Sequence, residues 1–401
     1  MMLLLSLPAY VRSFIERVSL DGGTLDNRVG LEDVDEEASL TMLPNAYKDG
    51  TLYSVLPESG AGDFDVVRGS AATRVNAEGL IEDVATNIPR IDYTDGTPSL
   101  LLEPQSTNLI TQSEIFTSWS DYQATSNTTT SPSGNSVLFL DFEDVRMFPT
   151  TAILNGTEYT SSIYLKANKV ADVRVRDAAG NDQLVSLTTE WVRYESTATA
   201  ASSHTLLIDA RFSQGLGASG LEIALWGAQI EALPYATSYI PTSGAIATRL
   251  ADSVTGAGDA TTFNSTEGVL YFEGSALAGS NSKTFGISDG TGSNRVLISL
   301  SNGGVRGFIA SNSAIAFDQT FAGASALDNN KIAVKYKLND FSVWVNGTEV
   351  LTDTTGGTPI SLSELAFDNG SGSAQFQGKV KDVRTYNTAL TDAELQTLTT
   401  I

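Results

Sequence analysis

Three closely spaced carboxylates form the nearest pattern in this sequence to one that could cleave a glycosidic bond. Asp141 and Glu143 alternate along a predicted strand and share a face, and Asp144 follows them. Glycoside hydrolysis needs an acid and a second carboxylate on opposite sides of the bond. Val145 and Arg146 stand where a further carboxylate would be expected. We therefore expect a protein that is not an enzyme and keep glycan cleavage as a remote alternative.

Other reactive side chains are scarce. His204 is the only histidine and cysteine is absent. Without cysteine a thiolate metal site and a disulfide are excluded, and one histidine rules out a histidine-rich metal site. The flanks of His204 suggest an exposed strand edge, so we do not expect it to act as a ligand or a base. The absence of cysteine also favours assembly in a reducing cytoplasm.

Two tight loops contain the oxygen-bearing residues that calcium prefers. One reads Asp289-Gly290-Thr291-Gly292 and the other Asp368-Asn369-Gly370-Ser371. Carboxylate, amide and backbone oxygens suit a hard cation, so calcium could bind at Asp289 and Asp368. The same residue types are favoured in hairpin turns for backbone reasons, and this plainer interpretation is the preferred one.

Tryptophan could stack its flat apolar face on a sugar ring. Trp191 and Trp226 lie inside predicted strands and are expected to pack in a core. Trp344 alternates with the apolar residues of its strand, so it is expected on the opposite face and is the better candidate for a ligand. We therefore predict a glycan site made of Trp344, Asp289, Asp368 and Asn369.

The chain of 401 residues is acidic, with a formal net charge of -23. Nucleic acid requires a basic footprint, so we expect no nucleic-acid partner. No apolar run approaches the length of a bilayer span, and residues 1–7 lack the basic region of a signal peptide, so we expect no membrane insertion. The charge is compatible with neutral glycans, although solubility alone explains it.

A short helix is predicted after Pro8, with an apolar stripe at helical spacing. The stripe consists of Tyr10, Val11, Phe14, Ile15 and Val18. So short a helix is not stable alone, and the stripe must pack on something. Docking on a partner subunit, with a role in oligomerisation, and packing on the next domain of the same chain both remain open.

The rest of the chain reads as β-structure. Short β-rich runs between Gly, Asp and Asn recur through residues 137–240 and 268–383, at the spacing of β-sandwiches. Residues 123–136 read as a polar link. These patterns predict four segments: an N-terminal docking segment at 1–42, an irregular β connector at 43–122, a first β-sandwich at 123–245, to which a resemblance described below assigns the jelly-roll type, and a second β-sandwich at 246–401.

Two local signals are strong within the last segment. Asn346-Gly347 is a two-residue hairpin signal after the strand at residues 341–345. Thr391 and Glu394 have the spacing of a capping box and predict a terminal helix.

Residues 331–349 and 375–395 resemble the laminin G-like, concanavalin A-like lectin/glucanase fold. The first stretch ends a strand in a V-N-G turn. The second follows the family pattern at Gly378, Val380, Asp382, Val383, Arg384, Tyr386, Asn387, Leu390, Thr391 and Glu394. The resemblance implies a C-terminal β-sandwich of this type over the last third of the chain.

Other stretches resemble viral proteins. Residues 157–166, 190–195 and 226–242 are similar to the jelly-roll, carbohydrate-binding-module-like domain of viral tail and fibre proteins. Residues 14–27 and 43–120 resemble segments of bacteriophage structural proteins. The resemblance implies an all-β virion protein, a homotrimer, assembled with other virion proteins in the host bacterial cytoplasm.

Two functions remain open at this point. In the first, the chain is a fibre or decoration subunit whose outward-facing sandwiches bind host-surface glycans. In the second, it is purely architectural and cements neighbouring virion subunits without binding glycan. A fold alone does not decide between them, because these folds carry many functions.

Overall fold

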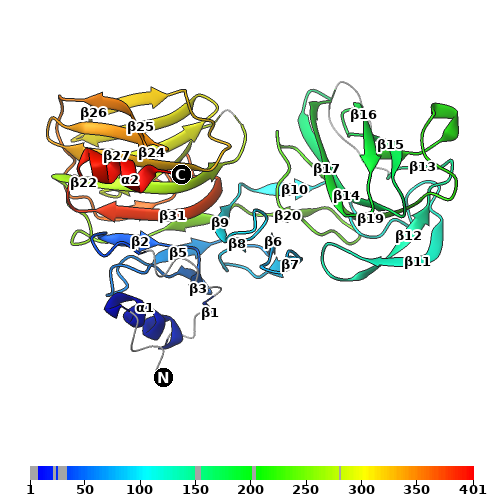
Figure 1. The fold of residues 1–401 in the computed structure, drawn as a ribbon, viewed down its shortest axis with the longest axis horizontal. Coiled ribbons are helices and arrows are strands. Elements are labelled where there is room, and N and C mark those ends of the chain that lie inside the picture. Colours follow the sequence, from blue (N-terminus) through cyan, green and yellow to red (C-terminus); the bar gives the residue numbers. More distant parts are fainter. Residues whose placement is uncertain (1–7, 21–23, 26–33, 150–154, 201–204, 280) are drawn as a thin grey trace. The chain divides into compact units, whose positions relative to one another are not determined.

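The computed structural model describes residues 8–20, 24–25, 34–149, 155–200, 205–279 and 281–401 (Figure 1). The chain forms two compact units, each assembled from separated stretches of sequence. Unit 1 comprises Met1–Gly69, Ala85–Pro104 and Ala251–Ile401, and unit 2 comprises Ser70–Val84 and Gln105–Leu250. His204 lies outside the described residues.

These units divide the chain differently from the four predicted linear segments. The predicted connector at 43–122 contributes to both units, because its strands pair with partners far away in sequence. The predicted jelly-roll segment, 123–245, lies wholly within unit 2.

The described residues of unit 1 form three antiparallel sheets. The largest has, in spatial order, β29 (Thr348–Asp353), β28 (Phe341–Val345), β27 (Asn330–Lys337), β22 (Glu267–Ala276), β31 (Gly378–Tyr386), β9 (Ser99–Leu102) and β8 (Ile91–Asp92), with β2 (Leu40–Met42) also paired to β31. The second has β26 (Ala314–Phe321), β25 (Gly304–Ser311), β24 (Arg295–Ser301), β23 (Lys283–Ser288) and β30 (Glu364–Ala366). The third has β1 (Thr24–Leu25), β3 (Ala46–Lys48), β4 (Thr51–Leu52), β5 (Phe64–Val67) and β21 (Ser253–Thr255).

The two larger sheets of unit 1 form a sandwich around one apolar core (Figure 1). Alternating side chains of facing strands point inward, as a two-layer sheet requires. Phe272 from β22 meets Phe285 from β23 with ring centroids 4.9 Å apart, and Phe376 contacts both rings. The predicted all-β sandwich class is confirmed.

The end of the chain covers the outer face of the largest sheet. The helix α2 (Asp392–Thr399) begins with the predicted capping box of Thr391 and Glu394 and lies against β27, β28 and β29 (Figure 1). Asn346 and Gly347 have φ of 51° and 81°, the left-handed turn that the hairpin signal predicted. All five residues of β28 are buried, since the core covers one face of this strand and α2 the other.

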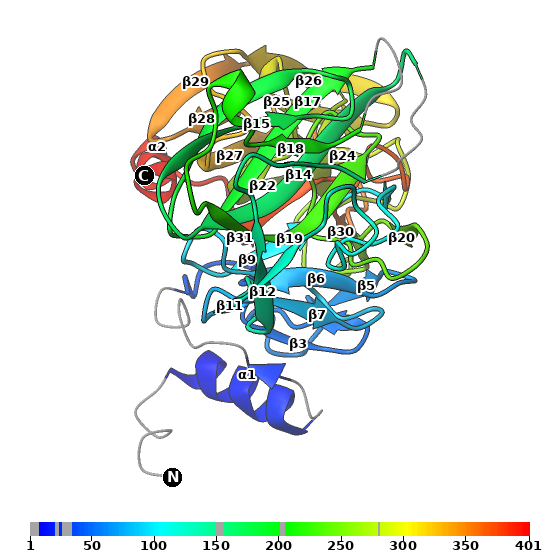
Figure 2. The same cartoon turned by 90° about the vertical axis from the view of Figure 1, so that its right-hand side faces the viewer.

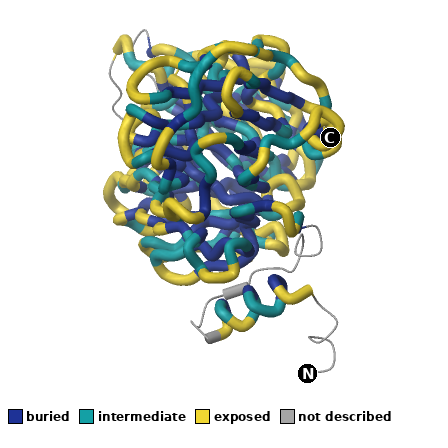
Figure 3. Tube along the Cα trace, turned by 90° about the vertical axis from the view of Figure 1, so that its left-hand side faces the viewer, coloured by how far each residue is buried: buried dark blue, intermediate teal, exposed yellow. Residues whose placement is uncertain are grey.

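The N-terminal helix α1 (Ala9–Leu20) packs on its own unit. Tyr10, Val11, Phe14 and Val18 are buried, and Ile15 packs against the same cluster. Their partners come from later parts of unit 1: Val34, Leu43, Ala46, Tyr53 and Val55. Figure 3 shows the buried and exposed positions alternating along the helix. Of the two alternatives for these five residues, the structure supports packing on the same chain rather than docking on a partner subunit, because later residues of unit 1 cover the stripe.

Unit 2 is a second sandwich (Figure 2). One sheet has β11 (Ala124–Thr130), β12 (Ser136–Asp141), β19 (Glu222–Glu231), β14 (Glu158–Ala167) and β17 (Val192–Thr199) in spatial order. The other has β13 (Arg146–Met147), β18 (Leu207–Asp209), β15 (Ala171–Arg176) and β16 (Asp182–Leu187). Two small pairs complete it, β6 (Ala72–Val75) with β7 (Ile81–Val84) and β10 (Ser106–Asn108) with β20 (Ala247–Arg249), beside a short 3-10 helix at Phe212–Gln214.

The polar link predicted at 123–136 is mostly a strand instead. Its threonine-rich part forms β11, an exposed edge strand paired with β12. Threonine has a high β propensity, and an edge strand needs few apolar residues.

No described helix is long and apolar enough to serve as a membrane span.

Four buried charges join the separated stretches of unit 1. Asp252 Oδ1 lies 3.1 Å from Arg68 Nη1, and its Oδ2 pairs with Arg90. Arg90 Nη1 also lies 2.6 Å from Glu103 Oε2. Burial disfavours the charge on Arg90, but Asp252 and Glu103 outweigh that effect and raise the pKa of its guanidinium. Two cations and two anions thus neutralise each other inside the unit.

A second buried pair lies within the family motif on β31. Arg384 Nη2 is 2.6 Å from Asp382 Oδ2, and its guanidinium lies over the ring of Tyr271. Asp382 Oδ1 has no hydrogen-bond partner among the described residues. Burial raises the pKa of Asp382 from 3.8 to about 6, although Arg384 opposes the change.

Replacing Asp252 with alanine should strongly destabilise unit 1, because Arg68 and Arg90 would remain buried without their shared carboxylate. We expect a loss of about 3–5 kcal/mol in the free energy of unfolding, measured by urea denaturation of the full chain. As a control, Asp318→Ala breaks the partly exposed pair with Arg306 and should cost less than about 1 kcal/mol. Similar losses in both variants would contradict the role of the buried cluster.

The Asp382 carboxyl should make stability depend on pH. Below its ordinary pKa of 3.8 it is protonated in both the folded and the unfolded chain, and as the pH rises through about 6 the folded chain must ionise a buried group. Compared with Asp382→Asn, the wild type should lose about 3 kcal/mol of unfolding free energy across this range. Urea denaturation at several pH values measures the difference. Parallel pH profiles for the two proteins would show that Asp382 is not perturbed.

Candidate functional site

The predicted stacking residue Trp344 is not available to a ligand. Its side chain is 6% exposed and packs with Tyr271, Tyr386 and Leu395 beneath α2. Its indole Nε1 donates a hydrogen bond to Ser342 Oγ at 3.2 Å. The prediction that Trp344 binds glycan is therefore wrong, because the C-terminal helix covers the face on which it lies.

The other three predicted residues do come together at one end of the unit 1 sandwich. Asp289 follows β23, and Asp368 and Asn369 follow the neighbouring strand β30. Arg295 Nη1 donates to the carbonyl oxygen of Asn369 at 2.7 Å and so joins the two loops. Beside them lies a groove of about 560 Å³, lined by Asp368, Glu364 and several serines, threonines and glycines. Among the described residues, no aromatic side chain lines this loop groove.

Asp289 and Asp368 serve as turn caps in the two loops. Asp289 Oδ1 accepts hydrogen bonds from the backbone N–H and the hydroxyl of Thr291, and Asp368 Oδ1 accepts one from the N–H of Gly370. Burial opposes the charge on Asp289, but hydrogen bonds from Thr291 and Asn294 lower its pKa overall. Within the part of the chain that the structure describes, no three carboxylates or histidines gather to hold a metal. The hydrogen bonds of Asp289 and Asp368 fit the hairpin-turn interpretation.

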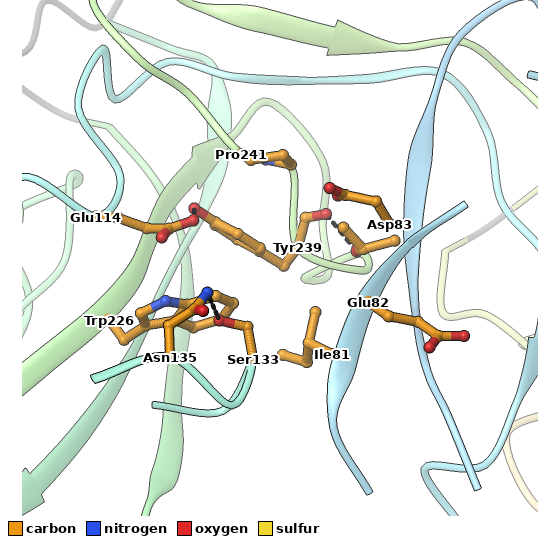
Figure 4. Close-up of a pocket in the computed structure, with 10 residues that line it drawn as sticks. Ile81, Glu82, Asp83, Glu114, Ser133, Asn135, Trp226, Tyr239 and Pro241 are labelled. Atoms are coloured by element: carbon orange, nitrogen blue, oxygen red, sulfur yellow. Dashed lines mark hydrogen bonds between the residues drawn. The ribbon is translucent and has the colours of Figure 1, made fainter. Parts of the chain in front are cut away.

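A different pocket lies in unit 2, and we call it the Trp226 pocket (Figure 4). Its volume is about 270 Å³. Strand β19 contributes Trp226, the segment after β19 contributes Tyr239 and Pro241, and the β6–β7 hairpin contributes one wall. The full lining is Thr73, Ile81, Glu82, Asp83, Glu114, Ser133, Asn135, Trp226, Tyr239 and Pro241.

The floor of the pocket is aromatic. The rings of Trp226 and Tyr239 lie 4.4 Å apart between centroids, and Tyr164 meets Trp226 edge to face at 5.5 Å. The pairing of β14 with β19 shifts register just after Trp226, which re-aims the side chains there. Gly227 has φ of 64°, and a Cβ at this position would press on both tyrosines at 3.3–3.4 Å. This glycine therefore allows the three rings to gather.

Polar groups surround the aromatic floor. The Tyr239 hydroxyl donates to Glu114 Oε1 at 2.8 Å and lies 2.6 Å from Ser113 Oγ. Burial, with Glu114 nearby, raises the pKa of Tyr239, so its hydroxyl stays protonated as a donor. Asn135 Nδ2 donates to Ser133 Oγ at 3.2 Å (Figure 4).

One buried donor in the pocket is unused. The indole Nε1 of Trp226 has no hydrogen-bond partner among the described residues, although the side chain is only 2% exposed. In Figure 4 this nitrogen lies on the side of the ring that faces Glu114. An unsatisfied buried donor costs roughly 1–3 kcal/mol. An acceptor oxygen brought against this N–H would remove that cost.

The pocket is suited to binding a small hydroxyl-rich molecule. It combines an apolar floor with a few convergent donors and acceptors, which is the usual composition of such sites. Glu114 and Asp83 are exposed carboxylates that can accept hydrogen bonds from ligand hydroxyls.

Sequence reasoning misses this pocket for identifiable reasons. The sequence predicts a core position for Trp226, and its burial confirms that prediction. Trp191, also predicted in a core, is only partly buried and donates to the carbonyl of Thr130 at 2.6 Å. Glu114 and Asp83 come from stretches more than one hundred residues before Tyr239, and no local spacing connects them. The one signal in the sequence is the aromatic content of 226–242.

The comparison with known families finds one match. Residues 277–396 match the family model described as the concanavalin A-like lectin/glucanases superfamily. No curated protein sequence matches the chain.

Several solved structures are similar to parts of the chain. The CBM40 of a Ruminococcus gnavus IT-sialidase, bound to α2,3-sialyllactose, is 18% identical over 35% of this chain and 86% of its own, with a TM-score of 0.32. Domain 4 of AbnA, a GH43 extracellular arabinanase from Geobacillus stearothermophilus in complex with arabinotriose, is 17% identical over 41% of this chain and 82% of its own, with a TM-score of 0.31.

The match at residues 277–396 agrees with the observed sheets. The matched stretch runs from the loop after β22 into α2 and includes the motif strand β31. This all-β protein therefore has a concanavalin A-like domain toward its C-terminus.

Proposed function

We propose that this chain is a non-enzymatic subunit of a bacterial virus appendage that binds a host-surface glycan in the Trp226 pocket. The observation that carries the proposal is the pocket itself, with an aromatic floor, exposed carboxylates and an unused indole donor. The concanavalin A-like lectin/glucanase match supports a role with carbohydrate. The loop groove is the weaker candidate, because no aromatic side chain of the described residues lines it.

The virion context rests on the resemblance of residues 14–27 and 43–120 to bacteriophage structural proteins. The same resemblance implies that the chain forms a homotrimer, has other virion proteins as partners and is assembled in the host bacterial cytoplasm. Several copies on one particle would raise the effective strength of a weak single site. The net charge of -23 supports a partner other than nucleic acid.

The carboxylates that could have cleaved a glycan are engaged in holding loops. Glu143 Oε2 accepts from the N–H of Gly220 at 2.7 Å, and Asp144 Oδ1 accepts from the N–H of Phe212 at 2.8 Å. Asp141 Oδ1 accepts from the N–H of Glu143 at 2.9 Å. These bonds supply a structural reason for all three residues, and this supports the proposal that the chain only binds.

A glycan array and an assay of adsorption to host cells test the proposal. The wild type should bind at least one glycan class, and Glu114→Ala should weaken that binding roughly five- to tenfold, the value of one hydrogen bond. Glu190→Ala is the matched control, since it removes an exposed glutamate of unit 2 outside the pocket and should change nothing. A calcium chelator should have no effect on the wild type.

Two outcomes would contradict the proposal. Glycan binding that survives Glu114→Ala but is lost in Asp368→Asn would move the site to the loop groove. A folded wild type that binds no glycan and no host cell would favour the architectural role.

A further inference from the structure

We infer that the Trp226 pocket selects neutral or amine-bearing saccharides and rejects acidic ones. This inference rests on the proposed function, because it specifies which saccharides the proposed site accepts. Its basis is the distribution of charge around the pocket together with the kind of donors that the pocket offers.

Two carboxylates at the pocket have no compensating cation among the described residues. Glu82 forms an ion pair with Arg74, with 2.8 Å between Oε1 and Nε, and it also accepts from Asn76. Asp83 and Glu114, by contrast, have no ion-pair partner in the described part of the chain, and both are exposed. No lysine or arginine is among the described residues that line the pocket. A ligand in the pocket therefore meets two uncompensated negative charges.

The donors of the pocket suit hydroxyl oxygens rather than a carboxylate. Proteins bind carboxylates with arginine, lysine or several convergent backbone N–H groups. In this pocket the side-chain donors are neutral: the unused N–H of Trp226 and the amide of Asn135, which donates to Ser133 Oγ, while the Tyr239 hydroxyl already donates to Glu114. A sugar hydroxyl can accept from Trp226 and donate to Glu114 or Asp83 at the same time. An anionic group can only accept, and it would lie beside both carboxylates.

A metal ion is not as good a ligand for these carboxylates as a saccharide. Glu82, Asp83 and Glu114 do not form a group that could hold a cation, since no such group of three exists among the described residues. The acidic lining therefore acts on the ligand directly, by attracting or repelling its charge.

Matched methyl glycosides test the selectivity. Methyl glucoside, methyl glucosaminide and methyl glucuronide share one ring and carry a neutral, a cationic and an anionic group at neutral pH, and the galacto series provides a second set. Competition against the best array glycan, followed by saturation-transfer NMR on the full chain, should rank amino sugar at or above neutral sugar and both above uronate. We expect an amino-sugar to uronate ratio on the order of tenfold, which shrinks at high salt.

Two variants test whether the charge of the pocket causes the amino-sugar to uronate ratio. Asp83→Asn should reduce the ratio, because the amide keeps the size of the side chain and removes its charge. Glu190→Gln makes the same change of charge outside the pocket and should leave the ratio as it is.

The outcomes separate the inference from the function on which it rests. Uronate bound as tightly as amino sugar, or a ratio that Asp83→Asn does not change, would overturn the selectivity and leave glycan binding intact. A folded protein that binds none of the glycosides and no array glycan would overturn both.

Discussion

The buried cluster of Arg68, Arg90, Glu103 and Asp252 is the interaction on which the organisation of this chain depends. The chain leaves unit 1 after Gly69 and Pro104 and returns to it at Ala85 and Ala251. Arg68, Glu103 and Asp252 are each adjacent to one of these crossings. Arg90 lies shortly after the crossing at Ala85. Since none of these charges is stable in the interior without the others, three separated stretches must meet before unit 1 is complete.

One of these crossings of the chain also supplies part of the candidate site. The β6–β7 hairpin, which supplies Ile81, Glu82 and Asp83 to the Trp226 pocket, is the stretch inserted between Gly69 and Ala85. Its two ends are tied where it leaves unit 1, because the N–H of Arg68 donates to Asn87 Oδ1 at 3.0 Å and the N–H of Asn87 donates to the carbonyl of Arg68 at 3.1 Å. Within unit 2, Thr73 Oγ1 donates to the carbonyl of Tyr239 at 2.5 Å and holds the hairpin against the aromatic floor.

Structure that depends on a few adjacent residues can be predicted from the sequence, whereas contacts between residues far apart in the chain cannot. The Asn346-Gly347 turn and the Thr391 cap are correct because each depends on a few adjacent residues. The prediction for Trp344 is wrong because strand alternation gives two faces but does not say that α2 covers the second one. The apolar stripe of α1 follows from helical spacing, but its partners at Leu43 and Tyr53 depend on tertiary packing. The Trp226 pocket needs distant segments to meet, which no spacing reveals.

The central claim is that a saccharide occupies the Trp226 pocket, and a crystal structure of the full chain with a neutral saccharide tests it most directly. The account predicts sugar density over the pocket lined by Trp226, Tyr239 and Glu114, with a ligand oxygen within hydrogen-bond distance of Trp226 Nε1. Density at the loop groove near Asp368, with the Trp226 pocket empty, would contradict the account.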